Sequence, residues 1–202
     1  MKVFKYNKLT YAFTMIELVF VIIIVGIISV MIAPSFGGNN TRQAADQIIS
    51  HLRYTQHLAM QDNKYDPANQ NWYKNRWNID LNTTNPTNST YSISFERYKN
   101  NGTNDGVKYA SNPLVPTQAL NANEMEELNL SEKYGVTITN NCSTNKIFFD
   151  DLGRPYDANS TATAPYQNLI RNICTIVLHD ENPAKNITIQ LQPETGYVRI
   201  NP

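Results

Sequence analysis

The hydrophobic residues of this chain form one continuous run near the N-terminus and short periodic patterns after it. Between Leu18 and Ala33 nearly every residue is Ile, Val, Leu, Phe or Met, and an acid, Glu17, stands at the head of the run. Counted from Phe13, the run reaches the roughly 20 residues that cross a bilayer. We therefore expect a transmembrane helix over residues 13–36.

The next segment, residues 41–61, has the pattern of an amphipathic helix. Its apolar residues recur at spacings of three, four and seven, which places them on one face: Ala45, Ile48, Ile49, Leu52 and Ala59. Such a stripe needs another element to cover it. A polar stretch, residues 123–135, is read as a short helix or turn.

Short alternating runs typical of strands follow. Two of them, residues 71–81 and 89–98, lie in a stretch rich in Asn, Thr, Tyr and Gly that otherwise predicts long surface loops. Five more occupy the last third of the chain: GVTITN, NKIFFDDLGRP, NICTIVLHD, NITIQLQ and TGYVRI. A helix followed by antiparallel strands predicts an α+β fold, in which a long N-terminal hydrophobic helix packs on an antiparallel β-sheet head domain.

The flanks of the hydrophobic run predict its orientation. Lys2, Lys5 and Lys8 precede it and no basic cluster follows it closely, so the positive-inside rule places the N-terminus in the cytoplasm and the head outside. A secretory signal peptide cut after Ala33 is the alternative. Its apolar core is normally shorter, and Met31 stands where a small residue is needed.

Charge and motifs exclude several classes of protein. The chain has 17 basic and 17 acidic residues and no basic block, so binding to nucleic acid is unlikely. No phosphate loop, nucleophile elbow, catalytic triad or metal spacing of Cys and His is present, so we expect neither an enzyme nor a cofactor. Asp150 and Asp151, in FFDDLGRP, are interpreted as turn formers rather than an acid and base pair.

The two cysteines, Cys142 and Cys174, lie in the part of the chain that this orientation places in an oxidising compartment. A disulfide between them closes a loop of about 30 residues and contributes about 3–4 kcal/mol in the chain-entropy model. Two buried free thiols are the alternative.

The segment AFTMIELVFVIIIVGIIS resembles the leader junction of type IV prepilins and type II secretion pseudopilins. The resemblance implies a leader of residues 1–12, cleavage by a prepilin peptidase between Ala12 and Phe13, and N-methylation of Phe13. Most relatives have Gly where this chain has Ala12. The resemblance also implies that Glu17 neutralises the terminal amine of a neighbouring subunit during assembly, and an ionisable group at membrane depth is normally paired.

Later segments, AADQIISHLRYTQHLAM, FFDDLGRPY and ITIQLQPETGYVRI, are similar to minor pseudopilins of the GspH/FimT group. The resemblance implies a structural minor pilin or pseudopilin of a secretion pseudopilus, a type IV pilus or a DNA-uptake filament. It implies a bacterial inner-membrane location with a periplasmic head over residues 37–202. Its partners are other pilins, the prepilin peptidase and an assembly platform protein of the inner membrane. Some relatives bind DNA through an Arg-rich tail, which this chain lacks, since Arg199 is alone there.

An alternative function is a membrane-anchored binding module whose head holds a secreted protein, a glycan or DNA. Trp72, Tyr73 and Trp77 are the candidate contacts, because aromatic rings stack on such ligands. The opposing interpretation places these rings in a satellite core under the long loop.

Three segments have an acid two residues before Asn-x-Ser/Thr, which resembles the extended acceptor site of bacterial oligosaccharyltransferases. Asn82 and Asn159 lie in predicted surface loops and are candidate glycosylation sites, and Asn129 is the weakest of the three. Chance in an Asn-rich chain is the alternative.

Overall fold

The computed structural model of this chain describes residues 14–32, 40–83, 88–159 and 161–201. The chain divides into two compact units, Met1–Gly38 and Asn39–Pro202. The predicted cleavage site, Ala12 and Phe13, lies outside the described residues.

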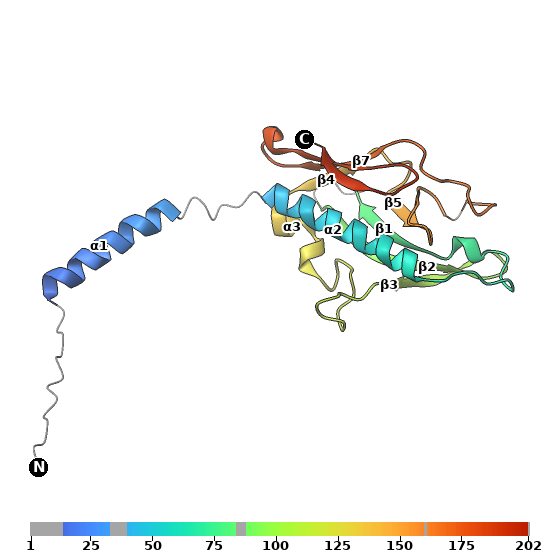
Figure 1. Cartoon of the computed structure of the whole chain (residues 1–202), viewed down its shortest axis with the longest axis horizontal. Coiled ribbons are helices and arrows are strands. Elements are labelled where there is room, and N and C mark those ends of the chain that lie inside the picture. Colours follow the sequence, from blue (N-terminus) through green and yellow to red (C-terminus); the bar gives the residue numbers. More distant parts are fainter. Residues whose placement is uncertain (1–13, 33–39, 84–87, 160, 202) are drawn as a thin grey trace, which may run out of the picture. The chain divides into compact units, whose positions relative to one another are not determined.

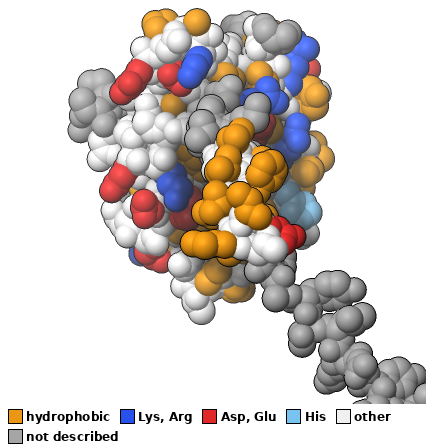
Figure 2. Space-filling model, turned by 90° about the vertical axis from the view of Figure 1, so that its left-hand side faces the viewer, with side chains coloured by type: hydrophobic (Ala, Val, Ile, Leu, Met, Phe, Trp, Pro, Cys, Tyr) orange, Lys and Arg blue, Asp and Glu red, His pale blue; other side chains and the backbone are white. Residues whose placement is uncertain are grey.

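The first unit contains the helix α1 (Met15–Ile32), which begins at a capped turn. The Thr14 side-chain oxygen accepts a hydrogen bond from the Glu17 backbone N–H at 3.3 Å, as an N-cap residue does. The large apolar side chains from Met15 to Ile28 are between 41% and 87% exposed. Figure 2 shows hydrophobic side chains gathered along this helix. They occupy consecutive positions, so they cover every face of the helix.

The prediction of a long hydrophobic helix over residues 13–36 is wrong. Within the part of the chain that the structure describes, no helix is both long and apolar enough to cross a membrane. The 18 residues of α1 span about 27 Å, less than the ~30 Å of a bilayer's hydrocarbon core. This finding contradicts the predicted transmembrane segment and the predicted single-pass location in the inner membrane.

The second unit is an α+β head with two antiparallel sheets, where the sequence analysis expects one. The first sheet has the order β3-β2-β1-β5-β6 and the second has the order β4-β7-β8-β9. In the first sheet the strands are β1 (Arg76–Asn82), β2 (Thr90–Tyr98), β3 (Asn104–Tyr109), β5 (Lys146–Phe149) and β6 (Pro155–Tyr156). In the second they are β4 (Thr137–Asn140), β7 (Cys174–His179), β8 (Ile187–Leu191) and β9 (Val198–Asn201).

The helix that packs on these sheets is α2 (Asn40–Gln61), which contacts strands of both (Figure 1). Its predicted apolar stripe is confirmed, because all five residues are buried: Ala45, Ile48, Ile49, Leu52 and Ala59. The first sheet covers the stripe with side chains such as Ile79 and Ile147, and the second with Ile176 and Ile189. One core therefore lies between α2 and the two sheets.

A single side chain of α2 joins turns from the two sheets. The Gln56 amide donates to the carbonyl oxygen of Gly153 at 2.8 Å, in the turn between β5 and β6. The same amide donates to the carbonyl oxygen of Thr195 at 3.0 Å, in the turn between β8 and β9. Gly196 follows with φ of +65°, and a Cβ there would lie 2.5 Å from the Gly153 carbonyl oxygen. The two turns therefore approach so closely at position 196 that only glycine fits there.

Two shorter segments complete the head. The stretch at 123–135 contains a single 3₁₀ turn, η3 (Glu126–Leu128), and the helix α3 (Leu130–Tyr134), as the sequence predicts. The strand β3 lies where the sequence predicts a loop, and it pairs with β2 although all six of its residues are exposed. Further 3₁₀ turns are η2 (Trp72–Lys74) and η4 (Pro183–Lys185).

Candidate functional site

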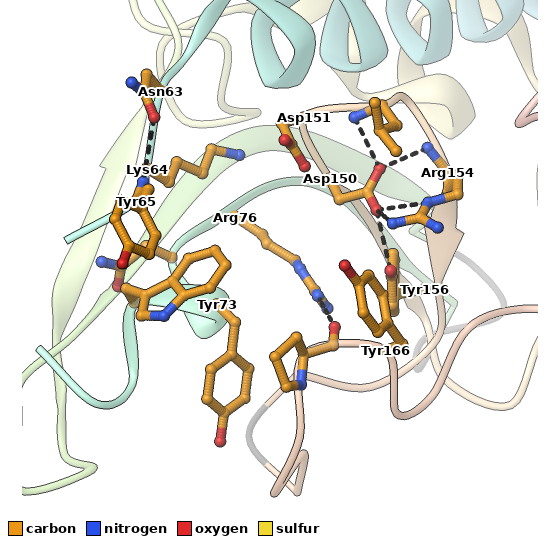
Figure 3. Close-up of a pocket in the computed structure, with 14 residues that line it drawn as sticks. Asn63, Lys64, Tyr65, Tyr73, Arg76, Asp150, Asp151, Arg154, Tyr156 and Tyr166 are labelled. Carbon is orange, nitrogen blue, oxygen red and sulfur yellow. Dashed lines mark hydrogen bonds and ion pairs between the residues drawn. The ribbon is translucent and has the colours of Figure 1, made fainter. Parts of the chain in front are cut away.

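A pocket of about 230 Å³ lies in the head between the segment before β1 and the segment that follows β5. Arg76 lies in its middle, with Tyr65 and Tyr73 on one side and Tyr156 and Tyr166 on the other (Figure 3). The pocket therefore combines aromatic walls with charged side chains, and each wall comes from a different part of the chain.

The turn after β5 is built around the Asp150 carboxylate. One oxygen accepts from the backbone N–H groups of Leu152 at 3.0 Å and Arg154 at 2.8 Å. The other accepts from the Arg154 side chain at 2.7 and 2.8 Å and from the Tyr156 hydroxyl at 2.9 Å. Burial, and then the nearby Asp150 carboxylate, raises the pKa of Tyr156 to about 12. The prediction that Asp150 forms a turn is confirmed.

Arg76, the first residue of β1, is 4% exposed. Its Nη2 donates to the carbonyl oxygen of Pro165 at 2.6 Å, and its guanidinium carbon lies 3.7 Å from the centre of the Tyr156 ring. Its Nη1 is also buried, but it has no hydrogen-bond partner among the residues that the structure describes. Burial lowers the pKa of Arg76. One donor of this buried cation thus remains available to a ligand.

Lys64 brings a second cation to the same pocket. Its Nζ is buried and likewise finds no hydrogen-bond partner in the described segments, although it lies 5.7 Å from the centre of the Phe95 ring. Burial lowers the pKa of Lys64 to about 8, and the neighbouring Arg76 adds to this effect, while Asp62 opposes it. Placing two buried cations close together costs free energy, since each disfavours the charged form of the other.

Trp72 and Tyr73 stand on the 3₁₀ turn η2, and both line the pocket. The Trp72 ring lies edge-on to Tyr65, with 5.2 Å between the ring centres, and edge-on to Tyr73 at 6.2 Å. Trp77 does not join them. It lies on β1 against the main core, and its indole N–H donates to Asp62 at 3.1 Å. The structure therefore places Trp72 and Tyr73 at the pocket and Trp77 against the main core.

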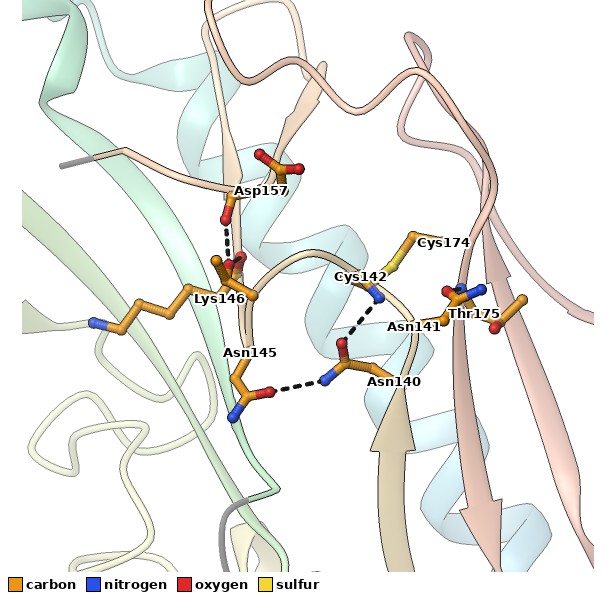
Figure 4. Close-up of a disulfide and its surroundings, with 9 residues drawn as sticks. Asn140, Asn141, Cys142, Asn145, Lys146, Asp157, Cys174 and Thr175 are labelled. Atoms are coloured by element: carbon orange, nitrogen blue, oxygen red, sulfur yellow. Dashed lines mark hydrogen bonds between the residues drawn. A yellow bond between two sulfur atoms is a disulfide. The ribbon is translucent and has the colours of Figure 1, made fainter. Parts of the chain in front are cut away.

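The predicted disulfide between Cys142 and Cys174 is present, with 5.1 Å between the Cα atoms (Figure 4). Cys142 follows β4, and Cys174 begins β7, its antiparallel neighbour. The backbone N–H of Thr175 donates to the Asn141 side chain at 2.6 Å, so hydrogen bonding accompanies the cross-link. The bridge closes one end of this strand pair.

The candidate glycosylation residues differ in exposure. Asn82 is exposed at the end of β1. Asn159 is 1% exposed, and its amide nitrogen donates to the Lys74 carbonyl oxygen, so it lacks the surface position that the prediction requires. Asn129 caps α3, where its side chain accepts from the Glu132 N–H and donates to the Glu132 carboxylate.

Sequence analysis did not find the charged residues of the pocket. Lys64 and Arg76 are isolated cations in a polar stretch, and Arg154 belongs to a motif interpreted only as a turn. Trp72 and Tyr73 were recognisable as adjacent aromatic residues. Nothing local marks the two cations, because their burial depends on residues 150–166 folding over them.

No match was found when the chain was compared with protein-family models, with curated proteins and with solved structures.

Proposed function

We propose that this chain is a structural subunit of a pilin-like filament. A prepilin peptidase cuts it between Ala12 and Phe13, and the mature chain then joins other pilins through α1. The filament is a type II secretion pseudopilus, a type IV pilus or a DNA-uptake filament. The other partner is an assembly platform protein.

The observation that carries this proposal is the combination of Phe-Thr-x-x-Glu with the exposed apolar surface of α1. A helix that is hydrophobic on every face is stable only when it is buried against other apolar surfaces. Each Leu, Ile, Val or Phe side chain contributes about 1.5–3 kcal/mol when it passes from water to a fully buried position. Copies of α1 in neighbouring subunits offer the matching surface.

Glu17 has two separable roles in this assembly. Thr14 and Glu17 have the spacing of a capping box, in which Glu or Gln at the third helical position serves equally well. Pairing with the amine of a neighbouring Phe13 needs the negative charge of Glu instead. A Gln at this position therefore keeps the first role and removes the second.

The experiment compares Glu17→Gln, Glu17→Val and Thr14→Ala in the native host. We expect all three chains to lose residues 1–12, as measured by intact mass. Both Glu17 variants should be absent from sheared filaments, because the unpaired amine is left inside the filament. Thr14→Ala should still assemble, because losing an N-cap costs only about 0.5–2 kcal/mol.

Two results contradict the proposal in different ways. A mature chain that still begins at Met1 shows that the peptidase does not process it, which removes the basis for a pilin. A Glu17→Gln chain that assembles like wild type shows that Glu17 acts only as a helix cap.

A further inference from the structure

The pocket around Arg76 holds two buried cationic nitrogens that lack hydrogen-bond partners among the described residues. Among its ionisable residues, Lys64, Arg76 and Arg154 are positive, and Asp150 and Asp151 are negative. Asp150 is paired with Arg154, and Asp62 is the nearby acid that most favours the charged form of Lys64. The buried nitrogens Nζ of Lys64 and Nη1 of Arg76 are also without hydrogen-bond partners in the described part of the chain. Buried donors that stay unpaired each cost about 1–3 kcal/mol, and charged ones cost more.

We propose that this pocket binds an acidic sugar of the hexuronate class, whose carboxylate is held by Lys64 and Arg76. The rings of Trp72 and Tyr73 pack against the sugar ring. This binding activity goes beyond filament assembly and does not depend on it.

The charge of the pocket favours a carboxylate over a phosphate. A singly charged carboxylate meets less repulsion from Asp62 and Asp151 than a phosphate monoester, which carries close to two negative charges at neutral pH. Arg76 already uses Nη2 to donate to the Pro165 carbonyl oxygen, which leaves Nη1 as its nitrogen without a partner among the described residues. Asp151, at the same pocket, also repels a second negative charge.

The size and lining of the pocket favour a single sugar ring. Its volume of about 230 Å³ lies below the roughly 300–1,000 Å³ of pockets for drug-sized ligands. The aromatic side chains offer flat apolar surfaces for the C–H face of a sugar. Asn63, Asn75 and Asp151 line the same space and can exchange hydrogen bonds with its hydroxyl groups. A carboxylic acid without hydroxyl groups would leave these polar side chains without hydrogen-bond partners on the ligand.

Access to the two nitrogens requires side chains at the rim to turn. Tyr65, Leu152 and Tyr166 line the pocket and are between 64% and 66% exposed, so their outer faces are free of packing contacts and leave room for these side chains to turn. Their movement lets a carboxylate reach atoms that water does not contact in this conformation.

The test is an NMR titration of the ¹⁵N-labelled full chain, which has two tryptophans and therefore two indole N–H signals. Trp72 lines the pocket, whereas the Trp77 indole is bonded to Asp62 outside it, so Trp77 is an internal reference. Trp72→Phe assigns the two signals. The probes are glucuronate, its neutral analogue glucuronamide, glucose 6-phosphate and N-acetyltyrosine.

We expect glucuronate to shift the Trp72 signal and to leave the Trp77 signal in place. Glucuronamide should bind about 10-fold more weakly or worse, since hydrogen bonds to the charged group are lost. Lys64→Met should weaken glucuronate binding by a similar factor. Lys108→Met, which changes an exposed lysine on β3, should bind like wild type.

Four results overturn the proposal. Equal binding of glucuronate and glucuronamide rules out a role for the carboxylate. Tighter binding of N-acetyltyrosine identifies the ligand as a peptide C-terminus, and tighter binding of glucose 6-phosphate identifies it as a phosphate. Absence of any Trp72 shift at saturating probe rules out the site, while leaving the filament proposal untouched.

Discussion

Replacing Lys64 by Met should stabilise the protein, although it removes a charged residue from a pocket that also contains acids. The Lys64 amine is buried without a hydrogen-bond partner in the described residues, and burial lowers its pKa from 10.5 to about 8. Met has a similar length, carries no charge and fills irregular apolar space well. The substitution therefore removes the cost of keeping a cation out of water.

The magnitude follows from the pKa of Lys64. The difference between 10.5 and about 8, at 1.36 kcal/mol per pKa unit, corresponds to about 3 kcal/mol of unfolding free energy. The contact between the Lys64 amine and the Phe95 ring opposes this gain by about 0.5–2 kcal/mol. We therefore expect Lys64→Met to raise the free energy of unfolding at pH 7 by about 1–2.5 kcal/mol.

The same pKa predicts how the stability of the two proteins depends on pH. Between pH 8 and 10.5 the unfolded chain still holds the Lys64 proton while the folded chain has released it, so wild-type stability rises with pH. From pH 7 to 9.5 the gain in unfolding free energy is about 2 kcal/mol. The Met variant lacks this rise, so its advantage should disappear toward pH 9.5.

Urea unfolding of the full chain at pH 7, 8.5 and 9.5 measures these differences. Tyrosine ionisation affects both proteins alike and cancels in the comparison. Lys108→Met controls for the loss of a positive charge and should change stability little, because Lys108 is exposed. A Lys64→Met protein that is less stable than wild type at pH 7 refutes the argument, as does a stability difference that does not vary with pH.

Two further predictions concern the disulfide of the head and the glycine at one of its turns. Replacing Cys142 and Cys174 together by Ser should lower the free energy of unfolding by about 3–4 kcal/mol, and an unchanged urea midpoint would contradict this. Gly196→Ala should destabilise more than Gly135→Ala, which has a similar φ of +68° but open space around its Cβ position. The strain of positive φ costs about 1–2 kcal/mol in both, and the clash with Gly153 should add about 1–3 kcal/mol, so equal thermal midpoints would refute the clash.

The elements that the sequence predicts are those with a strong local period. The apolar stripe of α2 and the alternation of buried and partly exposed residues in β7 arise because one face of each element packs on the core. β3 has no such signal, because all its side chains are exposed, and it is defined by backbone pairing with β2 and by the ion pair between Lys99 and Asp105. A strand that buries none of its side chains leaves no trace in the order of apolar residues.

The division of the strands into two sheets could not be predicted from the sequence either. Alternation fixes which side chains of a strand point inward, but it does not state which strand lies beside it. β5 pairs with β1 from far earlier in the chain, whereas β4 pairs with the later β7. These choices depend on long-range packing around α2. The hydrophobic run at the N-terminus illustrates the opposite error, since hydropathy predicted a membrane span where α1 has only 18 residues.

The candidate pocket was predictable only in part, for a related reason. Two adjacent aromatic residues, Trp72 and Tyr73, could be recognised as contacts for a ligand. Lys64 and Arg76 could not, because an isolated cation in a polar segment normally faces water. Their burial arises when residues that follow β5 fold across them, which no local pattern describes.

The bonds of Gln56 have a consequence for how this protein can change over evolution. Because one amide is shared by the turn between β5 and β6 and the turn between β8 and β9, neither turn can gain a residue without losing its bond to α2. The turn between β2 and β3 is held in a similar way by another segment, because the Asn71 side chain donates to the carbonyl oxygens of Lys99 at 3.1 Å and Asn100 at 2.9 Å. In descendants of this chain the two turns at Gln56 should therefore keep their lengths even where their sequences change.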